Sequence, residues 1–180
     1  MKRRLDPRDL AYCGLFGAAA LLLPVLFHLF HLGHIFMPMY LPLVTLAFLV
    51  RPLPAATTAA ITPVLSGAVT GMPPLYPPIA AFVGVELAFM AALIAIVVRR
   101  WPRLNPWFVL IPALLLGRAV NVALVYSFAR IITLPAGFLA GLSLVSGWPG
   151  LILMVAAVPP VAMLGRRYAR PTLESKGGNA

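Results

Sequence analysis

The sequence predicts an all-α integral membrane protein, built as a compact bundle of six transmembrane helices with both termini in the cytoplasm. The first observation is composition: 62% of the residues are hydrophobic, 10% are charged and the mean hydropathy is +0.98. A soluble domain carries about 25% charged residues. The second observation is that short basic clusters separate the apolar runs, which is a membrane pattern. The net charge of +10 therefore indicates a lipid bilayer as partner and no nucleic acid.

Six apolar runs predict the six spans. A helix that crosses a bilayer needs about 20 apolar residues, or fewer where protein shields it. The first run is longer than the apolar part of a signal peptide, so we expect a retained helix. The second is short and has prolines at its start, and the start of the sixth is blurred by glycine and serine. The expected spans are about Leu10–Phe30, Ile35 or Met39 to Val50, Leu53–Thr70, Pro77–Val98, Trp107–Ala129, and a stretch within Leu139–Leu164.

Basic residues set the orientation. All but two of the 14 lysines and arginines lie before the first span, between the second and third, between the fourth and fifth, or after the sixth. The positive-inside rule places these connections in the cytoplasm, which for a bacterial protein means the plasma (inner) membrane. We expect a basic N-terminus over residues 1–9, a transmembrane domain over 10–165 and a basic tail over 166–180.

The opposite face carries the distinctive side chains. The connection after the first span runs from His31 to Pro42, and the connection after the third runs from Gly71 to Pro78. Imidazole and thioether groups can face a ligand, and the prolines interrupt helices. This asymmetry is typical of a protein that meets its ligand from outside. The side chains concerned are His28, His31, His34, Met37, Met39, Met72, Tyr40 and Tyr76.

Two ionisable residues fall deep inside spans. Glu86 lies near the middle of the fourth span, Arg118 near the middle of the fifth, and Asn121 nearly one turn beyond Arg118. A charge within a membrane costs several kcal/mol unless it is paired. Because these spans are antiparallel neighbours, we expect a Glu86–Arg118 pair. Two interpretations stay open: a buried pair that fixes helix register, and a direct ligand contact.

Two further patterns have a functional and a structural interpretation. His28, His31 and His34 are spaced by three residues, so one helix face could hold a transition metal or haem, although interfacial histidines are also ordinary. Small residues on the first span, Gly14, Gly17 and Ala18, would let another helix approach closely. That helix belongs either to this chain or to a partner membrane protein.

Motifs for catalysis are missing from the sequence. It has no Walker-type phosphate loop, no Ser-His-Asp set, no HExxH and no CxxC. Only four acidic residues are available for acid–base work. We therefore expect a protein that is not an enzyme, has no cofactor, and needs another subunit to supply energy for transport.

Taken together, the chain resembles the substrate-binding S component of an energy-coupling factor (ECF) transporter over roughly residues 10–165. The resemblance rests on size, six spans, inward termini and a small-residue first helix. It also rests on the Phe36–Pro42 stretch, on Ser66–Pro78 with its Gly-Met-Pro-Pro sequence, and on Glu86 in the next helix. Gly14-x-x-x-Ala18 stands where the family has Ala-x-x-x-Ala.

This resemblance implies capture of a vitamin or metal ion at the outer face. It also implies docking on a transmembrane T component with two cytoplasmic ATPase subunits, and toppling in the membrane to release the ligand inward. Nickel and cobalt members carry an N-terminal Met-His motif, whereas this chain begins Met1-Lys2, which favours an organic ligand. The expected substrate-binding residues are His34, Met37, Met39, Tyr40, Met72, Tyr76, Glu86, Arg118 and Asn121.

Three alternatives to vitamin capture stay open. One is uptake of a metal or haem through His28, His31 and His34. Another is a structural subunit of a membrane complex that binds no small molecule and uses the small-residue faces for assembly. The third is a membrane enzyme acting on a small molecule, which the shortage of acids and nucleophiles disfavours.

Overall fold

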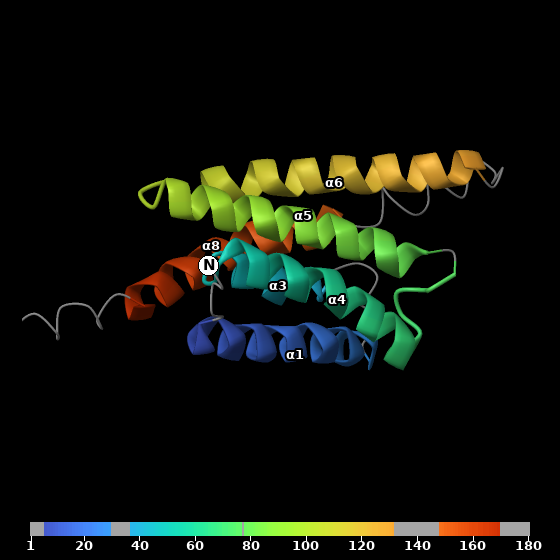
Figure 1. The fold of residues 1–180 in the computed structure, drawn as a ribbon, viewed down its shortest axis with the longest axis horizontal. Helices are drawn as coiled ribbons and strands as arrows, with labels where there is room; N and C mark the ends of the chain where they lie inside the picture. The colour runs from blue at the N-terminus through green and yellow to red at the C-terminus, as the bar shows by residue number, and fades with distance from the viewer. Residues whose placement is uncertain (1–5, 30–36, 77, 132–147, 170–180) are drawn as a thin grey trace, which may run out of the picture.

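The computed structural model describes residues 6–29, 37–76, 78–131 and 148–169, and everything stated below concerns these residues. They form helices joined by turns, with no strand among them. In chain order the helices are α1 (Pro7–Leu29), α3 (Tyr40–Ala47), α4 (Pro52–Thr70), α5 (Ile79–Arg100), α6 (Pro106–Ile131) and α8 (Trp148–Ala169) (Figure 1).

Four of these helices are long and apolar enough to cross a membrane: α1, α4, α5 and α6. Their bounds lie within three residues of the first, third, fourth and fifth predicted spans. Prolines explain several of the starts, because Pro7, Pro52 and Pro106 occupy first-turn positions where no backbone N–H donor is needed. The apolar part of α8, Pro149–Gly165, is shorter. This architecture fits a helical membrane protein.

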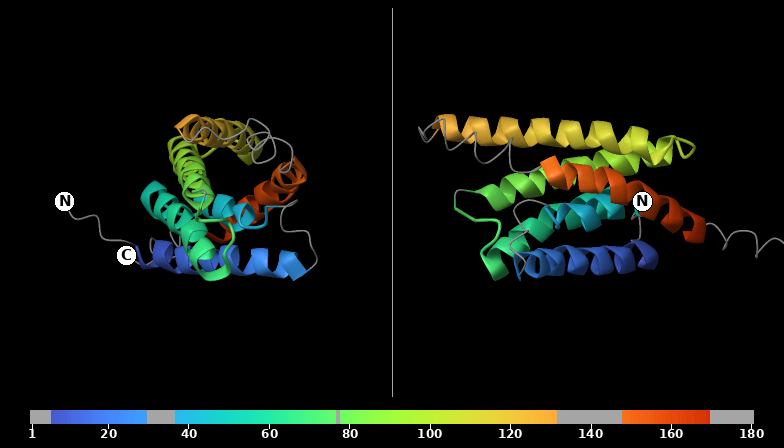
Figure 2. Two further views of the ribbon diagram at one scale, coloured as in Figure 1. Left: turned by 90° about the vertical axis from the view of Figure 1, so that its right-hand side faces the viewer. Right: turned by 180° about the vertical axis from the view of Figure 1, so that it is seen from behind.

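The second predicted span differs from expectation. α3 has eight residues, which at 1.5 Å per residue is about 12 Å, against about 30 Å for a bilayer core. Every side chain of α3 except Leu41 is buried, and the helix packs against α1, α4, α5 and α8. The end-on view of Figure 2 shows it inside the ring of longer helices. In the described residues this run is thus a core helix and not a full-length span, so six spans remain a prediction.

Alternate helix ends gather at the two ends of the bundle. The starts of α1, α4 and α6 and the ends of α5 and α8 lie toward the left of Figure 1, and the other ends of the long helices lie toward the right. In the sequence, Arg8, Arg51, Arg99, Arg100 and Arg103 adjoin the left-hand ends. These five of the basic residues that were predicted to share one side therefore adjoin one end of the bundle (Figure 1).

Small residues bring the long helices together. α4 and α5 form the most extensive pair, and a Cβ added to Gly84 on α5 would lie 2.8 Å from the backbone oxygen of Ala60 on α4. Gly117 on α6 likewise leaves room for the side chain of Met90 on α5. Membrane helices associate largely through such close packing, since lipid tails supply no hydrophobic drive between them. The position of α5 between α4 and α6 is therefore set by glycines.

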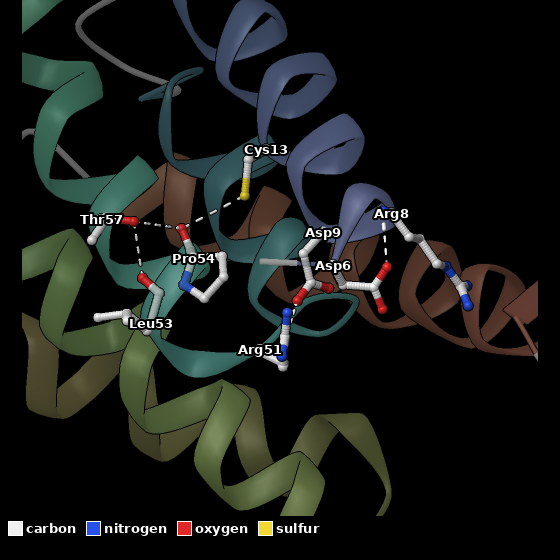
Figure 3. A network of polar contacts seen from close by, with 8 residues as sticks. All are labelled: Asp6, Arg8, Asp9, Cys13, Arg51, Leu53, Pro54 and Thr57. Atoms are coloured by element: carbon white, nitrogen blue, oxygen red, sulfur yellow. Dashed lines mark hydrogen bonds and ion pairs between the residues drawn. The ribbon is translucent and has the colours of Figure 1, made fainter. Parts of the chain in front are cut away.

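α1 is held against the start of α4 by polar as well as apolar contacts. Arg51 Nε donates to Asp9 Oδ2 over 2.5 Å, and Cys13 Sγ lies 3.6 Å from the carbonyl oxygen of Pro54 (Figure 3). One turn further, a Cβ on Gly17 would meet Thr58 at 3.4 Å. The rest of α1 is peripheral, because only 6% of its apolar stretch is buried. The sequence placed Arg51 between the second and third predicted spans but did not predict its ion pair with Asp9.

We expect Gly84→Ala to destabilise the fold by about 1–3 kcal/mol, because the new methyl group would overlap the Ala60 carbonyl. The measurement is the free energy of unfolding in mixed detergent–SDS micelles. Gly14→Ala is the matched control: an added Cβ there has nothing within 4 Å, so the change should be neutral or stabilise by up to about 1 kcal/mol. Equal effects at both positions would show that α4 and α5 are not packed this closely.

Candidate functional site

The candidate site is a buried polar cluster around Glu86, the acidic residue of α5. This side chain belongs to the buried face of the helix, together with Leu87 and Met90, and the residue as a whole is 0% exposed. Gly84 lies two residues before Glu86, and its close contact with Ala60 brings α5 against α4. The helix thus holds a carboxyl group in the apolar interior, where an unpaired charge is costly.

One carboxylate oxygen of Glu86 has two hydrogen-bond donors. Tyr40 Oη donates to Oε2 over 2.6 Å from the first residue of α3, and Asn121 Nδ2 donates over 2.8 Å from α6. Tyr40 and Asn121 are themselves 5% exposed. A single oxygen therefore joins three helices, and its hydrogen-bonding needs are met within the protein.

The other carboxylate oxygen of Glu86, Oε1, has weaker partners than Oε2. Arg118 Nη1 lies 3.6 Å from Glu86 Oε1, which is an ion pair but longer than the roughly 2.7–2.9 Å of a charge-assisted hydrogen bond. Among the described residues Oε1 is a buried oxygen without a hydrogen-bond partner. Each such buried group in a native protein calls for an explanation, such as a functional role or a bound water or ion. The predicted Glu86–Arg118 pair is present, and it leaves one acceptor open.

Arg118 is held from its other side by weak partners. Its Nη2 donates to Met37 Sδ over 2.6 Å, and its Cζ lies 5.6 Å from the centre of the Tyr40 ring. A thioether is a weak acceptor, whereas a guanidinium has five N–H donors. The side chain is 16% exposed, against 1% for Glu86. Arg118 is thus the partly exposed member of the cluster, and the acceptors that the described residues offer leave part of its donor capacity unused.

Met37 reaches this position through an unusual backbone conformation. Its φ angle is +45°, in the left-handed region that non-glycine residues rarely adopt. Its carbonyl accepts from the Tyr40 backbone N–H over 3.0 Å, so the turn leads directly into α3. Such conformations cost about 1–3 kcal/mol and tend to occur at functional sites. The same turn places the Met37 sulfur on the guanidinium.

The predicted site residues that the structure describes separate into three groups. Met37, Tyr40, Glu86, Arg118 and Asn121 come together in the cluster. Met39, 6% exposed, packs in the apolar core.

Two further predicted residues lie on the connection between α4 and α5, where Met72 is 53% and Tyr76 86% exposed, so both are on the surface. His34 and the alternative metal ligand His31 lie outside the described residues, and so does the side chain of His28. The described part of the chain contains no group of three His, Cys, Asp or Glu side chains suited to a metal ion.

The candidate docking residues lie on different faces of α1. Gly14 and Ala18 are exposed, one turn apart, whereas Gly17 is half-buried against Thr58 of α4. Gly17 thus packs within this chain, as the structural interpretation of the small residues requires. Gly14 and Ala18 remain available to another helix, and their docking role stays a prediction.

Sequence reasoning missed how the α4–α5 connection is tied down. Ser66 Oγ donates to the carbonyl oxygen of Met72 over 2.7 Å, and Thr70 Oγ1 donates to the same oxygen over 3.2 Å. Gly67 makes room for the Pro73 carbonyl, which a Cβ would meet at 2.6 Å. The sequence signal was a Ser66-Gly67 pair followed one turn later by Thr70. These three residues hold the loop against the end of α4.

Compared with known proteins, the chain matches no family model, no curated protein and no solved structure. The resemblance to ECF S components therefore rests on the residues of the sequence alone.

We expect Glu86→Met to destabilise the protein by about 3–5 kcal/mol, because it leaves the Arg118 charge buried without its partner and removes the acceptor of Tyr40 and Asn121. The double variant Glu86→Met, Arg118→Met should be less destabilised than Glu86→Met alone, since no uncompensated charge remains. Unfolding free energies in mixed micelles measure both. If the destabilisations caused by Glu86→Met alone and by Arg118→Met alone simply add in the double variant, the two charges are not coupled.

Proposed function

We propose that the chain is the substrate-capture (S) component of an ECF-type importer. It binds a small organic micronutrient, a vitamin or vitamin-like molecule, and delivers it inward with a transmembrane T component and two cytoplasmic ATPase subunits. The observation that carries the proposal is the open Oε1 oxygen of Glu86 beside a partly exposed arginine. An intramembrane charged residue is a functional hypothesis by default.

The different hydrogen bonding of the two Glu86 carboxylate oxygens favours ligand binding over a purely structural role. A carboxylate and a guanidinium that serve only to lock two helices are best placed in contact through two parallel hydrogen bonds. Here Oε2 is satisfied by Tyr40 and Asn121, while Oε1 and Arg118 stand 3.6 Å apart. The structural part of the carboxylate is complete and the other part is available to a ligand.

The surroundings of the cluster suit capture without chemistry. The buried Tyr40 ring and the partly buried Met37 thioether make the surroundings of the charged groups apolar. Binding sites for small molecules combine such apolar walls with a few placed polar groups. Thioethers also adapt to the shape of what they contact. Hydrogen-bonding groups and apolar side chains make up the described cluster, and binding is the activity that we propose for it.

The charge distribution supports the proposed orientation. The helix ends that adjoin the basic residues lie together at one end of the bundle (Figure 1). We assign this end to the cytoplasm of a bacterial cell, which puts the Met72 and Tyr76 connection outside. Both are exposed there, where an incoming ligand arrives.

The peripheral helix α1 supports a role for a partner subunit. Its apolar stretch is only 6% buried, and its exposed Gly14 and Ala18 leave a smooth surface for close helix approach. We assign the T component to this surface. ATP hydrolysis belongs to the partner subunits, because the sequence has no Walker-type loop.

The test is native mass spectrometry of the detergent-purified protein, with elemental analysis of the same sample. We expect wild type to retain an organic molecule and Arg118→Gln to lose it, with affinity at least tenfold weaker, about the value of one good hydrogen bond. Arg118→Lys keeps the positive charge beside Glu86, so comparing it with Arg118→Gln distinguishes loss of the ligand from loss of the fold. The matched control is Arg130→Gln, which alters an exposed arginine of the same helix that bonds to Tyr126 and should not affect retention.

Other outcomes favour the alternatives. If alanine variants of Glu86 and Arg118 lower thermal stability while ligand affinity is unchanged, the pair is structural. A stoichiometric metal would move the site to His28, His31 and His34. An empty protein that co-purifies with a structural partner and no ATPases would identify an assembly subunit.

A further inference from the structure

The geometry points to a ligand that is neutral and presents a planar amide-type edge, an N–H donor next to a C=O acceptor, to Glu86 Oε1 and Arg118. This inference rests on the proposed function, since it names the class of molecule that the same site would capture. It follows from the hydrogen-bonding capacities left over in the cluster, from its net charge and from its burial.

The open groups are complementary in kind and adjacent in space. Glu86 Oε1 is a buried acceptor that lacks a donor within the described residues. Within the described residues, the hydrogen bond of Arg118 Nη2 goes to the weak acceptor Met37 Sδ, and Nη1 stands 3.6 Å from that same Oε1. A molecule that fills both requirements needs a donor and an acceptor side by side on one edge.

The net charge excludes simple ions. Glu86 and Arg118 carry opposite charges, so the cluster is neutral before the ligand arrives. A carboxylate bound to Arg118 would come close to Glu86 Oε1, only 3.6 Å from Nη1, and would bury a net negative charge. An ammonium group on Oε1 would meet the guanidinium in the same way. A neutral ligand avoids both repulsions.

Desolvation separates a neutral amide from a zwitterion, the other class without net charge. A zwitterion brings two further charges out of water into a site where Glu86 is 0% exposed, and the transfer of each charge is strongly unfavourable. An amide edge loses only hydrogen bonds to water, which Oε1 and the guanidinium replace.

The test uses 2-pyridone, which carries the required edge, and N-methyl-2-pyridone, in which a methyl group replaces the N–H hydrogen. Benzoate, benzylamine and phenylalanine stand for the anion, the cation and the zwitterion. Dissociation constants are measured for the full-length protein in detergent micelles by calorimetry. We expect wild type to bind 2-pyridone at least about tenfold more tightly than its N-methyl analogue, and more tightly than the three charged probes.

Glu86→Gln makes the expectation specific to Oε1. Tyr40 and Asn121 both donate to Oε2, so the amide oxygen of the glutamine should stay there and its NH₂ group should replace Oε1. The variant then offers a donor where wild type offers an acceptor, and the preference for 2-pyridone should fall below about threefold. Arg118→Lys should weaken both pyridones while the preference remains, and Arg130→Gln should leave both dissociation constants unchanged.

The outcomes separate this inference from the proposed function. Equal binding of the two pyridones to wild type, tighter binding of a charged probe, or no binding of any probe overturns the amide-edge inference. The molecule retained in native mass spectrometry decides the proposed function independently. If that molecule is retained through Arg118 but has no N–H next to a carbonyl, capture stands and the ligand class is wrong. If nothing is retained and no probe binds, both fall.

Discussion

The hydrogen bonds to one carboxylate oxygen, Glu86 Oε2, are the interaction on which the interior of this protein depends. Tyr40 brings α3 to that oxygen and Asn121 brings α6, while the carboxylate itself comes from α5. A charge in a membrane interior is tolerated only where protein groups replace its water. The carboxylate thus requires these donors at this depth. The need for the Tyr40 donor at this depth explains why α3, a short helix with an almost fully buried surface, lies among the long helices.

Close packing of the long helices supplies the precision that this cluster needs. Gly84 lies two residues from Glu86 and lets α5 approach the Ala60 carbonyl of α4, while Gly117, next to Arg118, accommodates Met90. Both glycines therefore flank the charged residues on their own helices. A larger side chain at either place would move the helix, and a shift of a few tenths of an ångström matters for hydrogen bonds of 2.6–2.8 Å. The packing and the polar cluster are parts of one arrangement.

The two oxygens of the Glu86 carboxylate differ in how completely the protein satisfies their hydrogen bonds. Oε2 is saturated by the protein, whereas Oε1 and the guanidinium keep capacity for a further partner. Such a site can recognise a molecule by hydrogen bonds without transforming it. The proposed capture function and the proposed amide-type ligand both follow from this asymmetry. The peripheral position of α1 adds a surface on which the proposed partner subunit would dock.

The sequence by itself determined the membrane class, the four long helices, the segregation of arginines and the Glu86–Arg118 pairing, because hydrophobic length, charge position and antiparallel adjacency are local properties. It did not determine the length of α3, since an apolar run shows that residues are buried and not whether lipid or protein buries them. Only the tertiary structure decided that Asp9 pairs with Arg51 and that Met37 lies on Arg118, because these contacts join residues 42 and 81 positions apart. It also placed Met72 and Tyr76 on the surface, because the hydrogen bonds of Ser66 and Thr70 hold their loop at the end of α4.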